Sequence, residues 1–324
     1  MTKYHLKRKK IFIAGHGGMV GSSLVNFFKN KGFNNLILVS KKKLNLLDEK
    51  MVEKFIKKTK PEVIINCAGK VGGILANSTY PVEFLYQNIS IQLNLINSAH
   101  KNKIEHFINL GSSCIYPKEA KQPIKEKYLL SGYLEKTNEA YALAKIVGLK
   151  SCEYYNQQYG KSYFTLMPCN LYGPNDNFNL KNSHFIPALI KKIISSKSKA
   201  GSKVEIWGTG KPKREVMYVE DLARGIYFIL EKKIAKNKKL IEIIKENSVI
   251  NIGSGNEYTI HQFAKIISKI LKKKGKLVFN KKYPDGTMRK ILDNKVIRSL
   301  GWRPKTTLKE GLSKTIEWYK ENYL

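Results

Sequence analysis

Tyr141 and Lys145 are the two residues whose types and spacing point most directly to chemistry. They lie four residues apart in the segment NEAYALAK, at the start of a predicted helix. A spacing of four places two side chains on the same face of a helix. An ammonium group there can lower the pKa of the phenol, so that the tyrosine can exchange a proton with a substrate oxygen. The spacing alone is common by chance, so the interpretation depends on its context.

The segment GSSCIYP, residues 111–117, places the thiol of Cys114 beside two hydroxyl groups, directly after the apolar run HFINL. The run predicts a buried strand, and GSSCIYP predicts the turn that follows it. A thiol with an ordinary pKa of about 8.5 can act as a base once a nearby cation or dipole stabilises the thiolate. The alternative is that Cys114 is a small buried core residue.

A glycine-rich loop, GHGGMVG, follows the first predicted strand, KIFIAG. Glycine lets the backbone turn tightly and approach a pyrophosphate, whose charge then lies at the N-terminus of the next helix. A plain loop is the alternative, but a helix and a second strand about 20 residues later favour dinucleotide binding. We expect His16 to shape the loop. The cofactor-binding residues predicted here are Gly15, Gly18, Met19, Val20 and Gly21.

The second predicted strand, NLILVS, is followed by Lys41, Lys42 and Lys43. A site for NAD usually has an acidic residue near this point to bind the ribose 2′-hydroxyl, and this sequence has none there. A lysine can bind a 2′-phosphate instead. The sequence therefore favours NADP(H) as the cofactor, with Lys41 as a contact, against the alternative that these lysines are ordinary surface charge.

Strand and helix patterns alternate from the first strand onward, which predicts an α/β fold with a doubly wound parallel sheet of the Rossmann type. We expect residues 1–173 and 216–254 to form the NADP-binding domain. The patterns are looser elsewhere, and residues 174–215 and 255–324 are expected to form a smaller C-terminal lobe that binds substrate.

Composition limits the class of protein. The chain has 324 residues, of which 42% are hydrophobic, enough for a sizeable core. No apolar stretch approaches the roughly 20 residues of a membrane span, and the N-terminus lacks a signal-peptide pattern, so we expect a cytoplasmic protein without a membrane partner. The cysteines lack CxxC spacing, which argues against a metal site and a disulfide framework. They are Cys67, Cys114, Cys152 and Cys169.

The formal net charge of +34 raises the question of a nucleic-acid partner. Almost all of the basic residues are lysines spread over the chain, whereas specific contacts to bases and phosphates favour arginine. We therefore expect a lysine-rich surface and no nucleic-acid partner, with polyanion binding as the alternative. An anionic small substrate would be attracted in either case.

Together, the glycine loop, the serines after HFINL and the YxxxK pair resemble the short-chain dehydrogenase/reductase (SDR) superfamily, extended type. Within it, GSSCIYP, GKVGGILANSTYP, NEAYALAK, NLYGPNDNF and NSHFIPALI resemble the GDP-L-fucose synthase family over nearly the whole chain. The resemblance implies a bifunctional enzyme that converts GDP-4-keto-6-deoxy-D-mannose to GDP-L-fucose by 3,5-epimerisation and NADPH-dependent 4-keto reduction. The alternatives are another NDP-4-keto-6-deoxy-sugar epimerase/reductase or, less favoured, a noncatalytic dinucleotide-binding regulator.

The resemblance also implies roles for single residues. Tyr141 would exchange the proton of the C4 oxygen, Lys145 would tune it and hold the nicotinamide ribose, and Ser112 would orient the oxygen. Cys114 would be the base of epimerisation and His184 its acid partner. The implied contacts to the nucleotide sugar are Asn88, Asn170, His184, Trp207, Arg214, Arg289 and Lys290.

Two further implications concern assembly and cofactor. Relatives pair the helices predicted at about 82–101 and 140–159 across a two-fold axis, so the resemblance implies a homodimer; the alternative is that these helices only cover the sheet. Many relatives carry an arginine that binds the 2′-phosphate at the position of Gly17. This departure leaves open how strictly NADPH is preferred over NADH.

Overall fold

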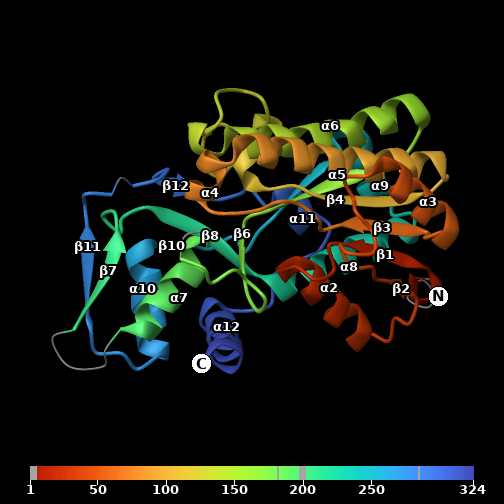
Figure 1. Ribbon diagram of the computed structural model, residues 1–324. Coiled ribbons are helices and arrows are strands. Elements are labelled where there is room, and N and C mark those ends of the chain that lie inside the picture. The colour runs from red at the N-terminus through yellow and green to blue at the C-terminus, as the bar shows by residue number, and fades with distance from the viewer. Residues whose placement is uncertain (1–5, 181, 197–201, 284) are drawn as a thin grey trace.

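The computed structural model describes residues 6–180, 182–196, 202–283 and 285–324, and its large lobe is built around a six-stranded parallel sheet (Figure 1). Strand β2 lies on one side of β1 and β3 on the other, so the order of the strands reverses at β1. Ligands bind at such a switch point in sheets of this kind. The strands run in the order β2 (Leu36–Ile37), β1 (Ile11–Ala14), β3 (Val63–Asn66), β4 (His106–Leu110), β5 (Phe164–Pro168) and β9 (Val249–Ile252).

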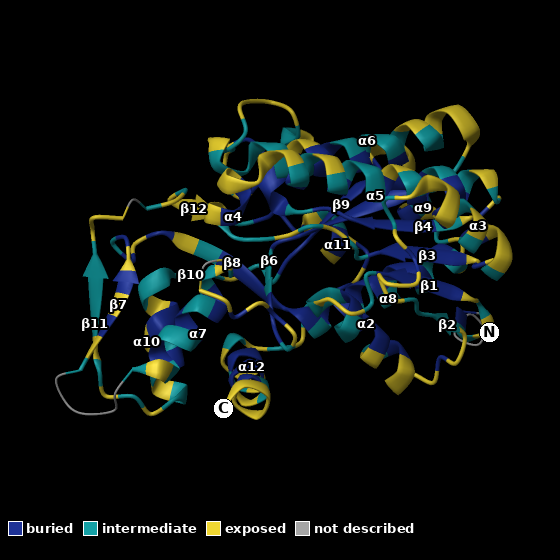
Figure 2. Ribbon diagram, in the orientation of Figure 1, coloured by how far each residue is buried: buried dark blue, intermediate teal, exposed yellow. Residues whose placement is uncertain are grey.

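Helices cover both faces of this sheet, which explains why its strands read as continuous apolar runs. Along β1, Ile11 and Ile13 pack into one core cluster, while Phe12 and Ala14 pack into another on the opposite face. The first cluster includes residues of α2 (Met19–Asn30) and α8 (Val219–Ile234), and the second includes residues of α3 (Glu49–Thr59) and α5 (Pro81–Lys101). Figure 2 shows the buried sheet between these layers.

The two long predicted helices are confirmed. Helix α5 spans Pro81–Lys101 and α6 spans Glu139–Tyr159, and the two pack side by side. Pro81 suits the first turn of α5 because the amide at that position needs no partner within the helix. Gly160, at φ +60°, ends α6 in the left-handed conformation that glycine adopts without strain.

The smaller lobe has two sheets and a core of its own. In one sheet β8 (Lys213–Tyr218) lies between β10 (Glu257–Thr259) and β12 (Arg289–Lys290) and also pairs with β6 (Asn170–Tyr172); in the other, β7 (Lys203–Trp207) pairs with β11 (Lys276–Asn280). The helices of this lobe are α7 (Phe185–Ser195), α10 (Ile260–Ile270) and α12 (Leu308–Tyr323).

The division between the lobes differs from the expected one near residues 292–302. This segment contains α11 (Lys295–Ser299), and its residues Leu292 and Trp302 pack into the core of the large lobe. The buried carboxylate of Glu215 joins the lobes, because it accepts hydrogen bonds from the backbone amides of Gly255 at 2.6 Å and Leu292 at 2.8 Å. The sequence pattern did not predict that residues 292–302 pack against the large lobe, since this packing depends on long-range contacts.

The helices α4 (Ile74–Thr79), before α5, and α9 (Lys238–Asn247), before β9, were not predicted, and neither were α7 and α11. Single 3-10 turns occur at η1 (Ser113–Ile115), η2 (Glu126–Tyr128) and η3 (Lys136–Asn138). Among the described residues, none of the helices combines the length and apolar character needed to cross a bilayer.

Candidate active site between the two lobes

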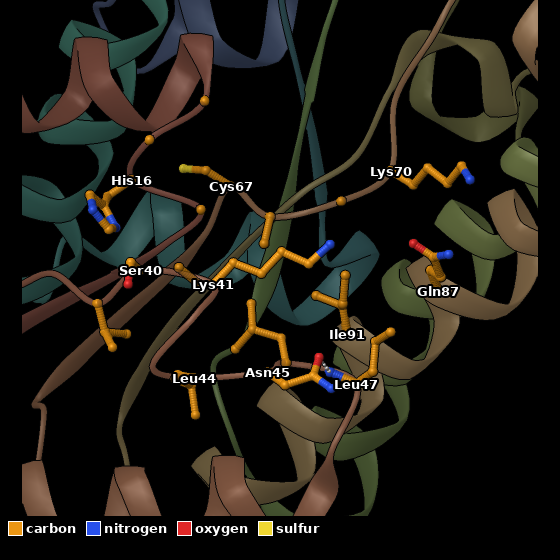
Figure 3. Close-up of a pocket in the computed structure, with 18 of the residues that line it drawn as sticks. His16, Ser40, Lys41, Leu44, Asn45, Leu47, Cys67, Lys70, Gln87 and Ile91 are labelled. Atoms are coloured by element: carbon orange, nitrogen blue, oxygen red, sulfur yellow. Dashed lines mark hydrogen bonds between the residues drawn. The ribbon is translucent and has the colours of Figure 1, made fainter.

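A cavity of about 660 Å³ lies at the carboxyl ends of β1 and β3 (Figure 3). Its walls come from the glycine loop, the segment after β2, the segment after β3, and α5. The lining residues include five that bear on cofactor binding: Gly15, Gly18, Lys41, Cys67 and Lys70. The cavity therefore occupies the place where the sequence predicted a dinucleotide.

The glycine loop has the geometry that a pyrophosphate requires. Gly15 has φ +78°, and a Cβ atom there would lie 2.7 Å from the backbone of Ala68. Gly18 is the N-cap of α2, so Met19 and Val20 form the first turn of that helix, where amides can face an anion. In contrast, a Cβ atom at Gly17 would meet nothing within 4 Å. The loop has room for a larger side chain at that position.

The structure distinguishes among the three lysines that follow β2. Lys41 lines the cavity together with Ser40 and His16, and these side chains are labelled in Figure 3. Lys42 and Lys43 are exposed residues outside the lining. Of the three predicted candidates, Lys41 is the one placed to meet a phosphate on the adenosine ribose.

Tyr141 and Lys145 are brought together as their spacing predicted, at the N-terminal part of α6. The Lys145 ammonium lies 5.8 Å from the centroid of the Tyr141 ring and donates a hydrogen bond of 2.9 Å to the carbonyl oxygen of Leu110 at the end of β4. Burial lowers the pKa of Lys145 to about 8. The ammonium therefore remains mainly protonated at neutral pH.

The expected lowering of the Tyr141 pKa is not found in the protein without ligands. Burial raises the pKa of Tyr141, the nearby Cys114 raises it further, and a hydrogen bond with Ser112 opposes both. The phenol is therefore protonated at neutral pH. A protonated phenol is the form that can donate a proton to a substrate oxygen during reduction.

Cys114 lies in η1, directly after the strand end that the sequence predicted. The Ser112 side chain caps this turn by accepting a hydrogen bond of 3.5 Å from the Cys114 amide. Burial raises the pKa of the Cys114 thiol, and the charge of Lys290 is the largest effect that lowers it, followed by Ser112 and Lys145. One buried cluster thus holds the groups expected for reduction and the thiol expected for epimerisation.

Lys290 and Arg289 were predicted together, but the structure separates them. Successive side chains of a strand point to opposite faces of the sheet. Lys290 faces the charges of Cys114 and Arg214, whereas the Arg289 Nε donates hydrogen bonds of 2.8 and 3.0 Å to the Glu257 carboxylate at the surface. In this structure Arg289 is committed to an ion pair, and only Lys290 faces the cluster.

His184 is the N-cap of α7, in a loop that touches the segment before α4 through a 3.0 Å hydrogen bond from the Gly73 amide to the Asn182 carbonyl oxygen. The residue is exposed, yet the many protein atoms around it reduce its hydration and lower its pKa. Its imidazole is therefore neutral at neutral pH. Reduced hydration is the one cause of this shift.

Asn88 and Asn170 occupy different settings. Asn88 is buried, and its Nδ2 donates hydrogen bonds to the carbonyl oxygens of Lys70 at 3.0 Å and Phe84 at 2.7 Å. One of these bonds lies within α5, and the other holds the segment at Lys70 that lines the cavity. Asn170 is partly buried and opens β6, where it pairs with Val216 of β8.

Trp207 and Arg214 lie in the small lobe with partners that the sequence did not indicate. The Trp207 ring stacks on Tyr283, and the Lys192 ammonium lies 4.5 Å from its centroid. Arg214 donates a hydrogen bond of 2.5 Å to the carbonyl oxygen of Thr287. Lys192 and Tyr283 were missed because they approach Trp207 from α7 and from the segment after β11, and no local motif announces such contacts.

Cys67 is a further residue whose position was missed. It follows β3 and lines the cofactor cavity, where burial raises the pKa of its thiol to about 12, partly opposed by Lys145. The sequence identified it only as an unpaired thiol. All four cysteines are unpaired in the structure, and the part of the chain that it describes holds no His, Cys, Asp or Glu cluster suited to a metal ion.

Comparison with known proteins gives a consistent result. Residues 11–253 match the family described as "NAD dependent epimerase/dehydratase family". The chain is 44% identical over 317 residues to GDP-L-fucose synthase of Escherichia coli (strain K12), covering 98% of each chain. It is also 44% identical over 311 residues to GDP-L-colitose synthase of Yersinia pseudotuberculosis, covering 96% of this chain and 97% of the relative.

Among solved structures, the GDP-mannoheptose C4 reductase from Campylobacter jejuni with NADP bound is similar over 97% of this chain and 99% of its own. Its TM-score is 0.87, and its sequence is 36% identical. The match covers both lobes, so the fold of the chain is that of a known architecture.

Proposed function

Because the chain belongs to the NAD dependent epimerase/dehydratase family, we propose that it converts GDP-4-keto-6-deoxy-D-mannose to GDP-L-fucose by epimerising C3 and C5 and reducing the C4 ketone. The observation that carries the proposal is the single cluster formed by Ser112, Cys114, Tyr141 and Lys145 beside a cavity suited to a dinucleotide. A plain reductase would need only three of these four groups. The thiol supplies the additional proton chemistry that epimerisation needs.

The cofactor that we propose is NADP(H), which supplies the hydride for C4 when bound. The glycine loop and the N-terminus of α2 are suited to its pyrophosphate, since a side chain at Gly15 would collide with the backbone of Ala68. Lys41 and Ser40 line the part of the cavity after β2, where they can meet the 2′-phosphate. Because Gly17 has no side chain to contact the 2′-phosphate, Lys41 and Ser40 would be the main basis of a preference for NADP.

In reduction, Tyr141 donates its phenolic proton to the C4 oxygen as negative charge develops there. Ser112 contacts Tyr141 and is placed to orient the same oxygen. Lys145 is held by the Leu110 carbonyl oxygen and keeps a positive charge near the phenol. Its pKa of about 8 means that it remains mainly protonated at neutral pH.

In epimerisation, the hydrogens at C3 and C5 are acidic because each carbon is next to the C4 ketone, and their removal gives an enolate. Hydrogen-bond donors near the C4 oxygen stabilise that charge, and Ser112 and Tyr141 are the donors at hand. We propose that Cys114 removes a proton from one face and His184 returns a proton to the other. Burial favours a neutral thiol, so this role requires Lys290 and Lys145 to support the thiolate as substrate binds.

The nucleotide end of the substrate carries two negative phosphates. Arg214 and Lys290 are register partners on the paired strands β8 and β12, and the positive charge of Arg214 lowers the pKa of Lys290. Two cations held this close favour a bound anion. We propose that they face the diphosphate and that Trp207 contacts the nucleotide, while Asn170 remains a proposed sugar contact.

A second candidate is an epimerase/reductase for a related GDP-sugar, a reading favoured by the equal identity to GDP-L-colitose synthase. NADPH oxidation with GDP-4-keto-6-deoxy-D-mannose, compared with other nucleotide 4-keto sugars, separates the candidates. Preference for another sugar would replace the proposed substrate. Failure to oxidise NADPH with any of them would favour a noncatalytic dinucleotide-binding protein.

We also propose a homodimer formed through α5 and α6, because exposed apolar residues lie on both helices. Examples are Tyr86 and Leu93 on α5 and Leu143 and Tyr154 on α6. Buried apolar contact of this kind is what a stable two-fold interface needs. Light scattering at micromolar concentration tests the proposal, and a monomer would contradict it.

The unpaired thiols support a reducing compartment, and we propose the cytoplasm.

A further inference from the structure

The stacked pair Trp207 and Tyr283 is unusual because both rings remain open to water. Trp207 ends β7, and Tyr283 follows the end of β11 by three residues. Their ring centroids are 4.3 Å apart with planes inclined by 16°, yet the residues are 54% and 41% exposed. An exposed aromatic surface in a protein of this size is more often a binding surface than a packing feature.

The two segments that carry these rings are fastened to each other. The Asp285 carboxylate accepts hydrogen bonds from the Thr209 amide at 2.9 Å and from the Thr209 hydroxyl at 2.6 Å. On the other side, Arg214 holds the carbonyl oxygen of Thr287 at 2.5 Å. Tyr283 is therefore kept in place over Trp207 by contacts that involve neither ring.

Positive charge lies next to the pair. The Lys192 ammonium is 4.5 Å from the Trp207 centroid, and Arg214 interacts with Asp285 just beyond Tyr283. An aromatic surface flanked by cations fits a nucleoside diphosphate, because the base can stack on the ring while the phosphates meet the charges.

We infer that Tyr283 positions the Trp207 indole as a stacking platform for the base of the nucleotide; the inference rests on the proposed function and extends it to this residue. The base cannot enter between the rings, since two stacking distances of about 3.5 Å exceed their separation. It stacks instead on the exposed remainder of the indole. Tyr283 restricts the rotation of an otherwise exposed side chain and so reduces the ordering that binding requires.

The platform contributes affinity without choosing the base. Every base has a π-face, so stacking on an aromatic side chain tolerates different bases. Recognition of guanine must come from hydrogen bonds made elsewhere. Loss of Tyr283 is therefore expected to weaken the binding of GDP and of ADP by the same factor.

The test is calorimetric titration of GDP and of ADP, each with saturating NADP⁺ so that the dinucleotide cavity is occupied. We compare the wild type with Tyr283→Ala and Tyr283→Phe, and use Tyr133→Ala as a control because Tyr133 is 92% exposed. Tyr283→Ala should weaken both nucleotides by about tenfold. Tyr283→Phe, which keeps a stacking ring, and Tyr133→Ala should bind like the wild type.

A second readout follows Trp207 itself. GDP should quench tryptophan fluorescence in the wild type, and Trp207→Phe should abolish the change. With the keto-sugar substrate, Tyr283→Ala should raise KM and leave kcat unchanged, since Tyr283 belongs neither to the cofactor cavity nor to the cluster of Ser112, Cys114, Tyr141 and Lys145.

Three results would overturn the inference: wild-type affinity in Tyr283→Ala, tighter binding in Tyr283→Ala, or weakening of GDP without weakening of ADP. Failure of the proposed function is recognised separately. It would appear as no NADPH oxidation with GDP-4-keto-6-deoxy-D-mannose while nucleotide binding still depends on Tyr283. Normal oxidation of NADPH with GDP-4-keto-6-deoxy-D-mannose, together with nucleotide binding that does not depend on Tyr283, would refute the stacking platform and leave the proposed function intact.

Discussion

The Lys290 ammonium, from the small lobe, is the strongest influence opposing the effect of burial on the Cys114 thiol, which belongs to the large lobe. The thiol can act as a base only as a thiolate, and burial disfavours the charged form. A residue of the small lobe therefore lowers the proton affinity of a thiol in the large lobe. This relationship gives the first prediction.

Replacing Lys290 by Met should raise the pKa of Cys114, because it removes the largest influence that opposes burial. The rate of Cys114 alkylation by iodoacetamide should therefore rise at a higher pH than in the wild type. Mass spectrometry of the Cys114 peptide distinguishes alkylation of this thiol from alkylation of Cys67. Arg289→Met is the matched control, since Arg289 faces away toward Glu257. An unchanged profile in Lys290→Met would refute the electrostatic role.

Cys114→Ser should abolish epimerisation and spare reduction. A hydroxyl is far too weak an acid to supply an anion near neutral pH, while the substitution scarcely changes the volume of the site. NADPH should then slowly reduce the unepimerised ketone to a GDP-6-deoxyhexose of D configuration, identified by NMR. Formation of GDP-L-fucose at nearly the wild-type rate would show that the thiol only fills space.

Tyr141→Phe should have the reverse effect. Without the phenol, no group protonates the developing alkoxide, and hydride transfer should fall by about 10²- to 10⁴-fold. Exchange of deuterium from solvent into C3 and C5 should continue, because Cys114 and His184 are unchanged. Loss of this exchange together with reduction would mean that the two steps share one proton donor.

The grouping of these residues was predictable from sequence, because Tyr141 and Lys145 share one helical turn and Ser112 and Cys114 share one turn after a strand. Their assignment to separate steps came from the family resemblance. The position of Lys290 relative to Cys114 was not predictable, since it depends on how β12 pairs with β8 in the other lobe. Since side chains alternate between the two faces of a strand, a strand predicted at Arg289 and Lys290 would have indicated that these two side chains point in opposite directions.

Lys41 and Gly17 give a cofactor prediction. Lys41→Glu should weaken NADPH binding and erode the preference over NADH, because Lys41 lines the cavity. Lys43→Glu is the matched control outside the lining. Gly17→Arg should strengthen NADPH binding, since the space there is open and a guanidinium pairs well with phosphate. Dissociation constants for both cofactors provide the check, and equal or tighter NADH binding by the wild type would contradict the assignment.

The central claim is that one site both epimerises and reduces the same sugar. The most direct measurement incubates the wild-type protein with GDP-4-keto-6-deoxy-D-mannose and NADPH in deuterated water and identifies the product by NMR. The account predicts GDP-L-fucose carrying deuterium at C3 and C5, with one NADPH oxidised per product formed. A reduced product of D configuration without deuterium at these carbons, or no oxidation of NADPH, would contradict it.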